Sequence, residues 1–375
     1  MPGTVRLAEP AELATWDARV VDAPGGDVYQ SVAWAEHRAR RGWRPRFLLV
    51  GDAPVLALVR PWPLVPGGSA YVSRGPIPTV DPATLAGRLA AVADWLAATG
   101  VDVVAADPEV PAGSGFGDRL VDLGFHRIEE IQPSRHRLDL PLGPGADEAS
   151  VLAGFSATTR NLVRQAERQG LRVVRLDQRV ATAPGFAPDL AHGLAPGFAP
   201  GPPTGPAQLE ALRRLYGILA DTAERRAFRL APWAVFADWT AAALGAGHVV
   251  ALVVEREDGE AIAGATFYRH GERLTYAVSG ERADMRRTHP GAARLLLWRA
   301  IQIALAEGRG VMDMGGVDVA GARREPRPDE PSYGLYQFKQ SFGARWVELT
   351  GAHERTIRPA RYALGRVLAR LRGRR

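Results

Sequence analysis

Residues 333–351 hold the side chains best suited to chemistry. Lys339 follows Phe338 directly, and Tyr333, Tyr336 and Phe342 stand nearby, at positions that cannot all share one helical or strand face. A lysine in aromatic surroundings is partly desolvated and can donate a strong hydrogen bond to a developing oxyanion. On spacing alone, however, the favoured interpretation is the end of an amphipathic helix with a solvated lysine, followed by a glycine and a strand.

A basic helical segment at 156–170 is suited to phosphate contacts. Arg160, Arg164 and Arg168 recur at intervals of four residues and so share one helical face. Three guanidinium groups in a row match phosphate oxygens well. A solvated charged face would give the same spacing, and the pattern alone does not separate the two interpretations.

Three further segments could hold a ligand. Asp313 ends a predicted buried strand before Gly315-Gly316, where glycines permit close approach of the backbone, although an aspartate there is equally typical of a turn. Arg74 follows another predicted strand, at a rigid Gly-Pro turn, and could reach an anionic ligand. Residues 225–233 mix cations with aromatics, a composition that fits either a phosphorylated ligand or a loop anchored in the core.

Composition narrows the classes of function. The 375 residues are 46% hydrophobic and 23% charged, typical of a globular protein with two or three domains. The chain has no cysteine, which excludes thiol catalysis and cysteine-ligated zinc, and its 8 histidines lack metal-binding spacing, so no metal is expected. A net charge of +6 favours a polyanionic partner, although the arginines after residue 365 are also typical of a solubilising end.

The location that the sequence predicts is cytoplasmic. The N-terminal residues lack the pattern of a signal peptide, and no apolar run approaches the roughly 18 residues of a membrane span. At most, we expect peripheral contact with the inner face of the membrane.

The periodicity predicts a mixed α/β fold in two parts with the same order of elements, each with a helix, a strand meander, a helix and a strand. The strongest predicted helices cover 82–99, 151–169, 208–225, 232–244 and 291–307, and the best hairpin joins 249–255 to 261–269. Residues 181–206 repeat Ala-Pro-Gly-Phe-Ala-Pro, a composition that predicts a mobile loop without helix or packed strand. A second flexible loop is expected at 320–331.

These segments fall in an order that resembles the FemABX family, the aminoacyl-tRNA-dependent transferases that build peptidoglycan cross-bridges. The resemblance runs through nearly the whole chain. Its landmarks are Gln30–Trp34, Tyr71–Ile77, Thr159–Gly170, Arg226–Phe228, Ala263–Ala265, Leu295–Trp298, Asp313–Gly316, Phe338–Gly343 and Gly351. It implies two GNAT-like domains in tandem, one at 1–148 with 347–375 and the other at 149–346.

The resemblance also implies roles for particular residues. Phe338 and Lys339 match the family's Phe-Lys pair at the aminoacyl-tRNA site, whose lysine is thought to stabilise the tetrahedral intermediate. In precursor binding, Arg38 is nearest to a first-helix lysine and Arg229 to an arginine, while Trp233 stands where that arginine's partner tyrosine is expected. The family's strand tyrosine corresponds to Tyr276. We add Arg74 and Asp313 to this substrate-binding set, and Arg160, Arg164 and Arg168 as contacts for tRNA phosphates.

The implied activity moves an amino acid from aminoacyl-tRNA to the stem-peptide amine of a UDP- or lipid-linked muropeptide precursor. Such ester aminolysis needs positioning and oxyanion stabilisation, with aminoacyl-tRNA as co-substrate and no cofactor. An acyl-CoA-dependent N-acyltransferase is the main alternative, because residues 287–293 partly match a pyrophosphate-binding loop. A nucleic-acid or envelope-associated binding protein without catalysis is a third interpretation.

Overall fold

The computed structural model describes residues 4–373 except 79, 133–134, 178–197, 201–204, 227 and 318–323. The chain folds into two compact units, each made of more than one stretch of sequence. Unit 1 comprises 1–137, 318–324 and 347–375, and unit 2 comprises 138–317 and 325–346. The predicted domains place the first boundary at residue 148 instead, and that boundary stays a prediction.

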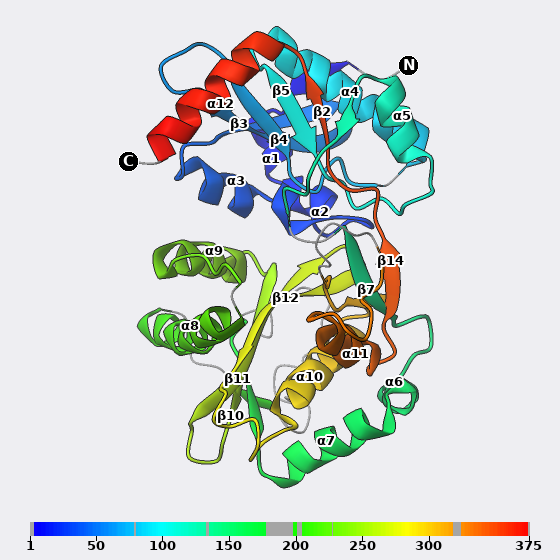
Figure 1. The fold of residues 1–375 in the computed structure, drawn as a ribbon, viewed down its shortest axis with the longest axis vertical. Helices are drawn as coiled ribbons and strands as arrows, with labels where there is room; N and C mark the ends of the chain where they lie inside the picture. Colours follow the sequence, from blue (N-terminus) through cyan, green and yellow to red (C-terminus); the bar gives the residue numbers. More distant parts are fainter. Residues whose placement is uncertain are drawn as a thin grey trace. The chain divides into compact units, whose positions relative to one another are not determined.

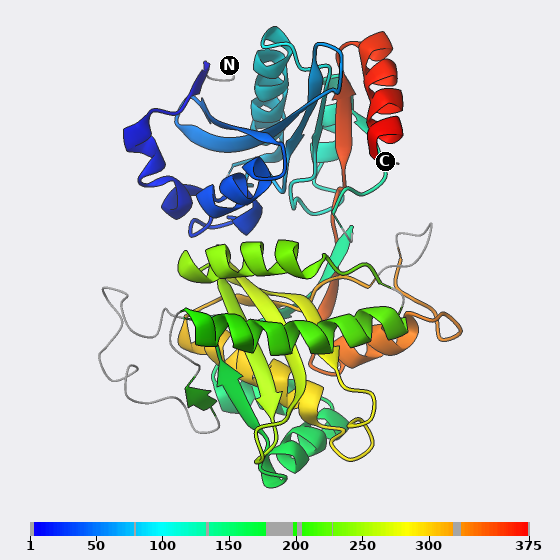
Figure 2. The same cartoon turned by 90° about the vertical axis from the view of Figure 1, so that its left-hand side faces the viewer.

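Unit 1 is built on a mixed sheet with the strand order β1-β2-β3-β4-β5-β15-β6. Its strands are β1 (Val5–Leu7), β2 (Arg44–Val50), β3 (Ala53–Pro61), β4 (Gly68–Val72), β5 (Val103–Ala106), β6 (His126–Arg127) and β15 (His353–Thr356). Its helices are α1 (Pro10–Leu13), α2 (Trp16–Val20), η1 (Val28–Gln30), α3 (Val32–Ala39), α4 (Pro82–Ala98), α5 (Phe116–Asp122) and α12 (Pro359–Gly373). Helices α4 and α12 cover opposite faces of this sheet (Figures 1 and 2).

Helix α4 shows how the sequence encodes this unit. Asp81 caps its N-terminus by accepting a hydrogen bond from the backbone of Thr84, and Pro82 occupies the first turn, where its missing N–H costs nothing. Its apolar residues at helical spacing are fully buried against the strands and form much of the core of unit 1. The helix predicted over 82–99 is therefore confirmed.

Unit 2 holds a second mixed sheet, ordered β14-β7-β13-β12-β11-β10-β8-β9. The strands are β7 (His136–Pro141), β8 (Arg172–Arg175), β9 (Phe198–Pro200), β10 (Val249–Glu255), β11 (Ala261–His270), β12 (Arg273–Glu281), β13 (Val311–Asp313) and β14 (Arg345–Glu348). The helices are α6 (Glu148–Gly154), α7 (Ala157–Arg168), α8 (Pro206–Arg226), α9 (Trp233–Gly245), α10 (Ala292–Ala306) and α11 (Tyr333–Gln340). Helices α8 and α9 lie on one face of this sheet, and α10 and α11 on the other (Figures 1 and 2).

The structure corrects two sequence predictions in unit 2. The helix predicted over 151–169 is broken at Phe155, because Ser156 begins a new helix by capping the backbone of Thr159. Within 181–206, Phe198–Pro200 form a strand that pairs in parallel with β8, so the prediction of no packed strand is wrong there. The rest of that predicted mobile loop lies almost wholly outside the described residues.

The predicted class, mixed α/β with two sheets, is confirmed. Throughout the described part of the chain, no helix is both long enough and apolar enough to cross a bilayer.

Candidate functional site

Helix α11 places Lys339 inside the protein rather than on its surface. Tyr336 and Lys339 are the buried residues of this helix, and only 4% of Lys339 is exposed. The expectation of a solvated lysine at a helix end is therefore wrong about its surroundings. The same lysine is the only one in the chain, among 47 lysines and arginines in total.

A tight turn after β13 faces this lysine. Gly315 adopts a left-handed backbone with φ of 71°, and its N–H donates to Asp313 Oδ1 at 2.7 Å. The other carboxylate oxygen of Asp313 accepts a hydrogen bond from Thr275 Oγ1 at 3.1 Å. Both oxygens of this buried carboxylate thus hold the turn and its neighbouring strand, which favours the turn interpretation of Asp313 over direct substrate binding.

The lysine ammonium group is fixed on that turn. Lys339 Nζ donates to the carbonyl oxygen of Gly316 at 2.6 Å. A side chain at position 315 would bring its Cβ within 3.0 Å of the Tyr276 carbonyl oxygen and 3.5 Å of Lys339 Nζ. Glycine at 315 thus leaves a small gap between the lysine and β12. Three elements predicted from the sequence border this gap: the lysine, the glycine turn and the strand that carries the tyrosine.

Tyr276 stands on β12 beside this turn. Its ring stacks on Phe267 with centroids 5.4 Å apart. Burial raises the pKa of the Tyr276 hydroxyl to about 12, so the group is protonated at neutral pH and can serve as a hydrogen-bond donor.

Phe338 points to a different neighbour. The guanidinium carbon of Arg294, near the start of α10, lies 5.2 Å from the centre of the Phe338 ring. Burial lowers the pKa of Arg294, as expected for a cation with little access to water. Sequence reasoning missed Arg294, although a signal exists: it is a cation in the first turn of an apolar helix, where the helix dipole disfavours positive charge.

A hydroxyl network secures α11 to α7, and sequence reasoning missed it too. Thr159 Oγ1 donates to Ser341 Oγ at 2.8 Å, and Ser341 Oγ donates to the carbonyl of Phe338 at 2.6 Å. Ser156 Oγ and Arg294 Nε both donate to Thr159 Oγ1, at 3.1 and 3.4 Å. The carbonyl between Phe338 and Lys339 is therefore held from the N-terminus of α7.

The three arginines of α7 do not form one equivalent row. Arg160 is half-buried and donates to the carbonyl oxygens of Ala153 and Phe155 at the end of α6. Arg164 and Arg168 are exposed. Arg160 thus has a structural task, while the other two present their charge to solvent.

Arg229 lies in the segment between α8 and α9, and Trp233 begins α9; these two helices lie on the other face of the sheet from α11 (Figure 1). Arg229 is exposed, whereas Trp233 packs against Tyr216 with ring centroids 5.4 Å apart. Arg213 lies 5.0 Å from the Trp233 ring. Among the residues that the structure describes, neither predicted position contacts the turn that holds Lys339.

In unit 1, Arg38 lies between two tryptophans. Its guanidinium carbon is 5.2 Å from the ring centre of Trp34 and 4.7 Å from that of Trp43. Its buried Nε has no hydrogen-bond partner within the described part of the chain. Burial, with a smaller contribution from the nearby charge of Arg60, lowers the pKa of Arg38. A desolvated cation of this kind is suited to binding an anion.

Arg74, by contrast, already faces two carboxylates. Its guanidinium lies 3.6 Å from Asp107 and 3.7 Å from Glu109. Burial would lower the pKa of Arg74, but these two charges outweigh it and raise the pKa. Its charge is largely neutralised, so it is less suited than Arg38 to an added anion.

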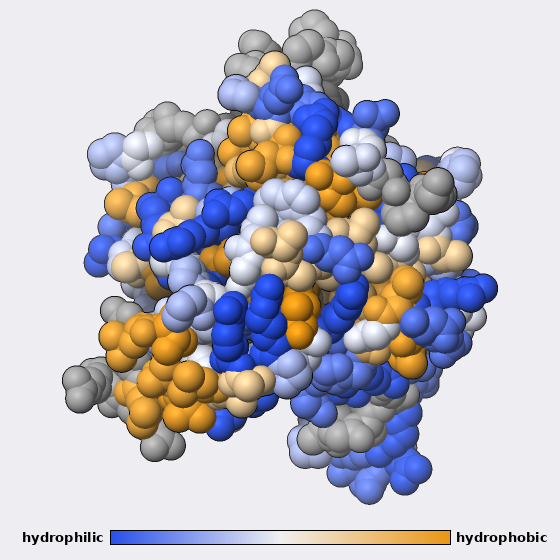
Figure 3. All heavy atoms as spheres, turned by 90° about the horizontal axis from the view of Figure 1, so that it is seen from above, coloured by the Kyte–Doolittle hydropathy of each residue, from blue (hydrophilic) through white to orange (hydrophobic). Residues whose placement is uncertain are grey.

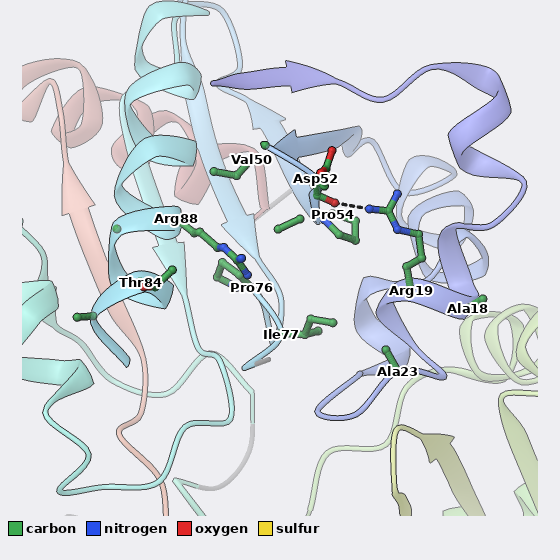
Figure 4. Close-up of a pocket in the computed structure, with 14 residues that line it drawn as sticks. Ala18, Arg19, Ala23, Val50, Asp52, Pro54, Pro76, Ile77, Thr84 and Arg88 are labelled. Carbon is green, nitrogen blue, oxygen red and sulfur yellow. Dashed lines mark hydrogen bonds between the residues drawn. The ribbon is translucent and has the colours of Figure 1, made fainter. Parts of the chain in front are cut away.

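An open hollow of about 970 Å³ lies elsewhere in unit 1 (Figure 4). Arg19 and Arg88 line it together with Asp52, and Arg19 donates a hydrogen bond to the carbonyl oxygen of Asp52. None of the predicted site residues lines this hollow.

Comparison with known proteins finds a family match for the part of the chain that carries Lys339. Residues 249–370, about a third of the chain, match the model of the FemAB family. Over these residues the chain is similar to the FemAB family. The match confirms the family predicted from the sequence and, at family level, the class of acyltransferase. No curated protein matches the chain by sequence.

Solved structures extend the likeness to the whole fold. FemX is 18% identical, with a TM-score of 0.74 over 96% of this chain and 99% of that chain. L-PGS from Bacillus licheniformis is 13% identical, with a TM-score of 0.53 over 98% and 97%. The C-terminal domain of a putative lysylphosphatidylglycerol synthetase from Agrobacterium fabrum is 14% identical, with a TM-score of 0.51 over 96% of each chain. At these identities the likeness establishes the fold.

Proposed function

We propose that this FemAB-family protein moves an amino acid from aminoacyl-tRNA to the stem-peptide amine of a peptidoglycan precursor. The observation that carries the proposal is the buried Lys339, whose ammonium group is fixed on the turn after β13 within the family-matched segment. Charge stabilisation by a preorganised donor is what ester aminolysis requires most.

The reaction uses the lysine as an oxyanion donor. The acceptor amine attacks the ester carbonyl carbon, a C–N bond forms, and negative charge develops on the carbonyl oxygen. The C–O bond to the tRNA ribose then breaks, and the ribose oxygen takes the proton that the amine loses. The hydrogen bond from Lys339 Nζ to the carbonyl oxygen of Gly316 gives the ammonium group a defined orientation.

We assign further binding roles from the features of each unit taken by itself. We assign acceptor phosphate binding to Arg38, because its guanidinium is desolvated and its Nε has no hydrogen-bond partner in the described structure. Phe338 and Tyr276 border the aminoacyl end, and Arg164 and Arg168 supply exposed charge for tRNA phosphates. The reaction needs no cofactor beyond aminoacyl-tRNA.

The acyl-CoA alternative gains no support from the loop at 287–293. A Cβ at Gly291 would meet the carbonyl oxygen of Leu162 on α7 at 2.2 Å. This glycine therefore serves the packing of α10 against α7, which explains Gly291 without a pyrophosphate.

The test combines donors and acceptors. The protein is incubated with charged tRNA pools or acetyl-CoA, together with UDP-linked or lipid-linked pentapeptide. Mass spectrometry then measures the mass of the stem peptide. We expect a mass gain of amino-acid size only with charged tRNA. A gain of acetyl size with acetyl-CoA alone would overturn the proposal.

A further inference from the structure

Helix α12 exposes a stripe of aliphatic side chains. Leu364, Val367 and Leu371 are 48%, 52% and 57% exposed. Their spacing of three and four residues places them along one side of the helix. Three of the large hydrophobic side chains that are exposed in the described structure thus stand in one line.

The opposite side of α12 fixes this orientation. Arg361 donates two hydrogen bonds to the fully buried carboxylate of Asp102, at 2.9 and 2.7 Å. Gly365 packs so closely on Trp62 that a Cβ there would lie 2.3 Å from the indole ring. The helix cannot rotate to bury its aliphatic stripe without breaking these contacts.

An apolar loop packs on the same helix. Residues 62–66 read Trp-Pro-Leu-Val-Pro, without a polar side chain. Trp62 stacks on Tyr362 of α12 with ring centroids 6.2 Å apart, and Leu64 in the same loop is 93% exposed. A side chain that open to water contributes nothing to the core of its unit.

The exposed charge on α12 has one sign. The sequence from 359 to 375 contains six arginines and no aspartate or glutamate. Arg366 and Arg370 are exposed on the helix, and Arg366 also lies 5.4 Å from the Tyr362 ring. We call Leu64, Leu364, Val367, Leu371, Arg366 and Arg370 together the α12 face.

We propose that the α12 face binds the surface of an anionic lipid bilayer. The aliphatic side chains enter the boundary between headgroups and acyl chains, and the arginines contact lipid phosphates. A nucleic acid would match the charge equally well, but it offers no apolar layer for three half-exposed aliphatic side chains. Figure 3 shows the molecule from above, where hydrophobic patches stand beside strongly hydrophilic residues. This inference does not depend on the proposed reaction.

Vesicle co-sedimentation tests the proposal with the full chain. The wild type is mixed with vesicles of phosphatidylcholine alone or of phosphatidylcholine with phosphatidylglycerol. The apolar variant carries L364Q, V367Q and L371Q, and the charge variant carries R366E and R370E. Val121→Gln is the matched control, because Val121 is 58% exposed on α5 of the same unit. Glutamine keeps a good helix propensity, and circular dichroism checks folding.

We expect binding to the anionic vesicles only, weaker at high salt, with each multiple variant at least about tenfold weaker and V121Q unchanged. Binding of the apolar variant at wild-type level would overturn the proposal. So would loss of tRNA binding in the charge variant while vesicle binding persists. A dimer that the apolar variant converts to a monomer, without wild-type binding to vesicles, would assign the face to self-association instead.

Discussion

Lys339 stands out because the chain otherwise uses arginine for every basic side chain. An arginine is always charged and recognises carboxylates and phosphates through a planar fork, whereas a lysine ammonium is a compact point charge. A single buried lysine kept against that background indicates a position where the ammonium group itself matters. Its contact with Gly316, at the end of a buried strand, gives it a defined direction.

Replacing Lys339 tests that role directly. We expect both K339M and K339R to lower the single-turnover rate on the order of a hundredfold, because neither places an ammonium donor at the oxyanion. Precursor affinity should stay near the wild-type value in both. Rapid-quench kinetics and calorimetry measure the two quantities. If K339R transferred at the wild-type rate, an ammonium group would not be required.

Gly315 offers a second test, with a matched control in the same unit. Gly315→Ala strains a backbone at φ of 71° and brings a methyl group within 3.5 Å of Lys339 Nζ. Gly308→Ala meets the same kind of strain, at φ of 65°, with nothing within 4 Å. Urea unfolding should show a loss of roughly 1 kcal/mol from backbone strain in both variants, and a larger loss in G315A, whose Cβ also comes within 3.0 Å of the Tyr276 carbonyl oxygen. Only G315A should also slow transfer, so an equal rate in the two variants would contradict a role for the gap.

The family resemblance, rather than residue spacing, singled out Lys339 and Tyr276. The lysine, the glycine turn and Tyr276 were identified from the sequence, but the spacing of α11 favoured a solvated lysine. The contact that decides burial lies 23 positions earlier in the chain, at Gly316. Local periodicity cannot report on such a partner. The lone lysine in an arginine-rich chain was the sequence signal available.

At the scale of elements, the junction of α7 and α11 holds the segment that carries Phe338 and Lys339. Ser156 begins α7, Thr159 is fully buried, and Ser341 follows the last turn of α11. Their hydroxyl groups join the two helices through a chain of hydrogen bonds. We therefore assign Thr159 a positioning role: it reaches the carbonyl of Phe338 through Ser341, and it also accepts a hydrogen bond from Arg294, which packs on the Phe338 ring.

Removing the Thr159 hydroxyl tests this. We expect T159V to lower kcat several-fold with little change in KM, because a lost buried hydrogen bond costs about 1–3 kcal/mol and here shifts α11. T159S should restore the rate. Thr222→Val is the control. Thr222 is buried on α8 and makes comparable hydrogen bonds, in its case to the backbone of Glu281 on β12. If T159V and T222V lowered kcat equally, Thr159 would contribute to stability alone and not to the positioning of α11.

Sequence patterns located most long elements and missed short or terminal ones. The helices at 82–98 and 292–306 are confirmed, because their apolar periodicity covers four turns or more. The break between α6 and α7 was missed, since the apolar pattern runs through it and only Ser156 marks it. Helix α12 was not predicted, and its large apolar residues Leu364, Val367 and Leu371 face outward in the structure. A buried stripe and an exposed one give the same sequence pattern.

At the scale of the molecule, each unit has its own buried ionic cluster. In unit 1, Asp102 holds Arg361 and the indole N–H of Trp62, which ties α12 to the sheet. In unit 2, Arg269 is 1% exposed and pairs with Asp177 and Glu307, so that β11, the end of β8 and the end of α10 meet on one guanidinium. Neither cluster was foreseen, because its members stand far apart in the sequence.

The cluster in unit 2 predicts a specific acid sensitivity. Burial alone would raise the pKa of Asp177, but Arg175 and Arg269 outweigh it and lower the pKa from 3.8 to about 2. Because folding lowers this pKa, the stabilisation is complete above about pH 4 and is lost as the pH falls towards 2. The shift corresponds to about 2 kcal/mol. Urea unfolding across this range should therefore show a shallower decline for D177N than for the wild type. Parallel declines would mean that Asp177 and Arg269 do not couple as the structure places them.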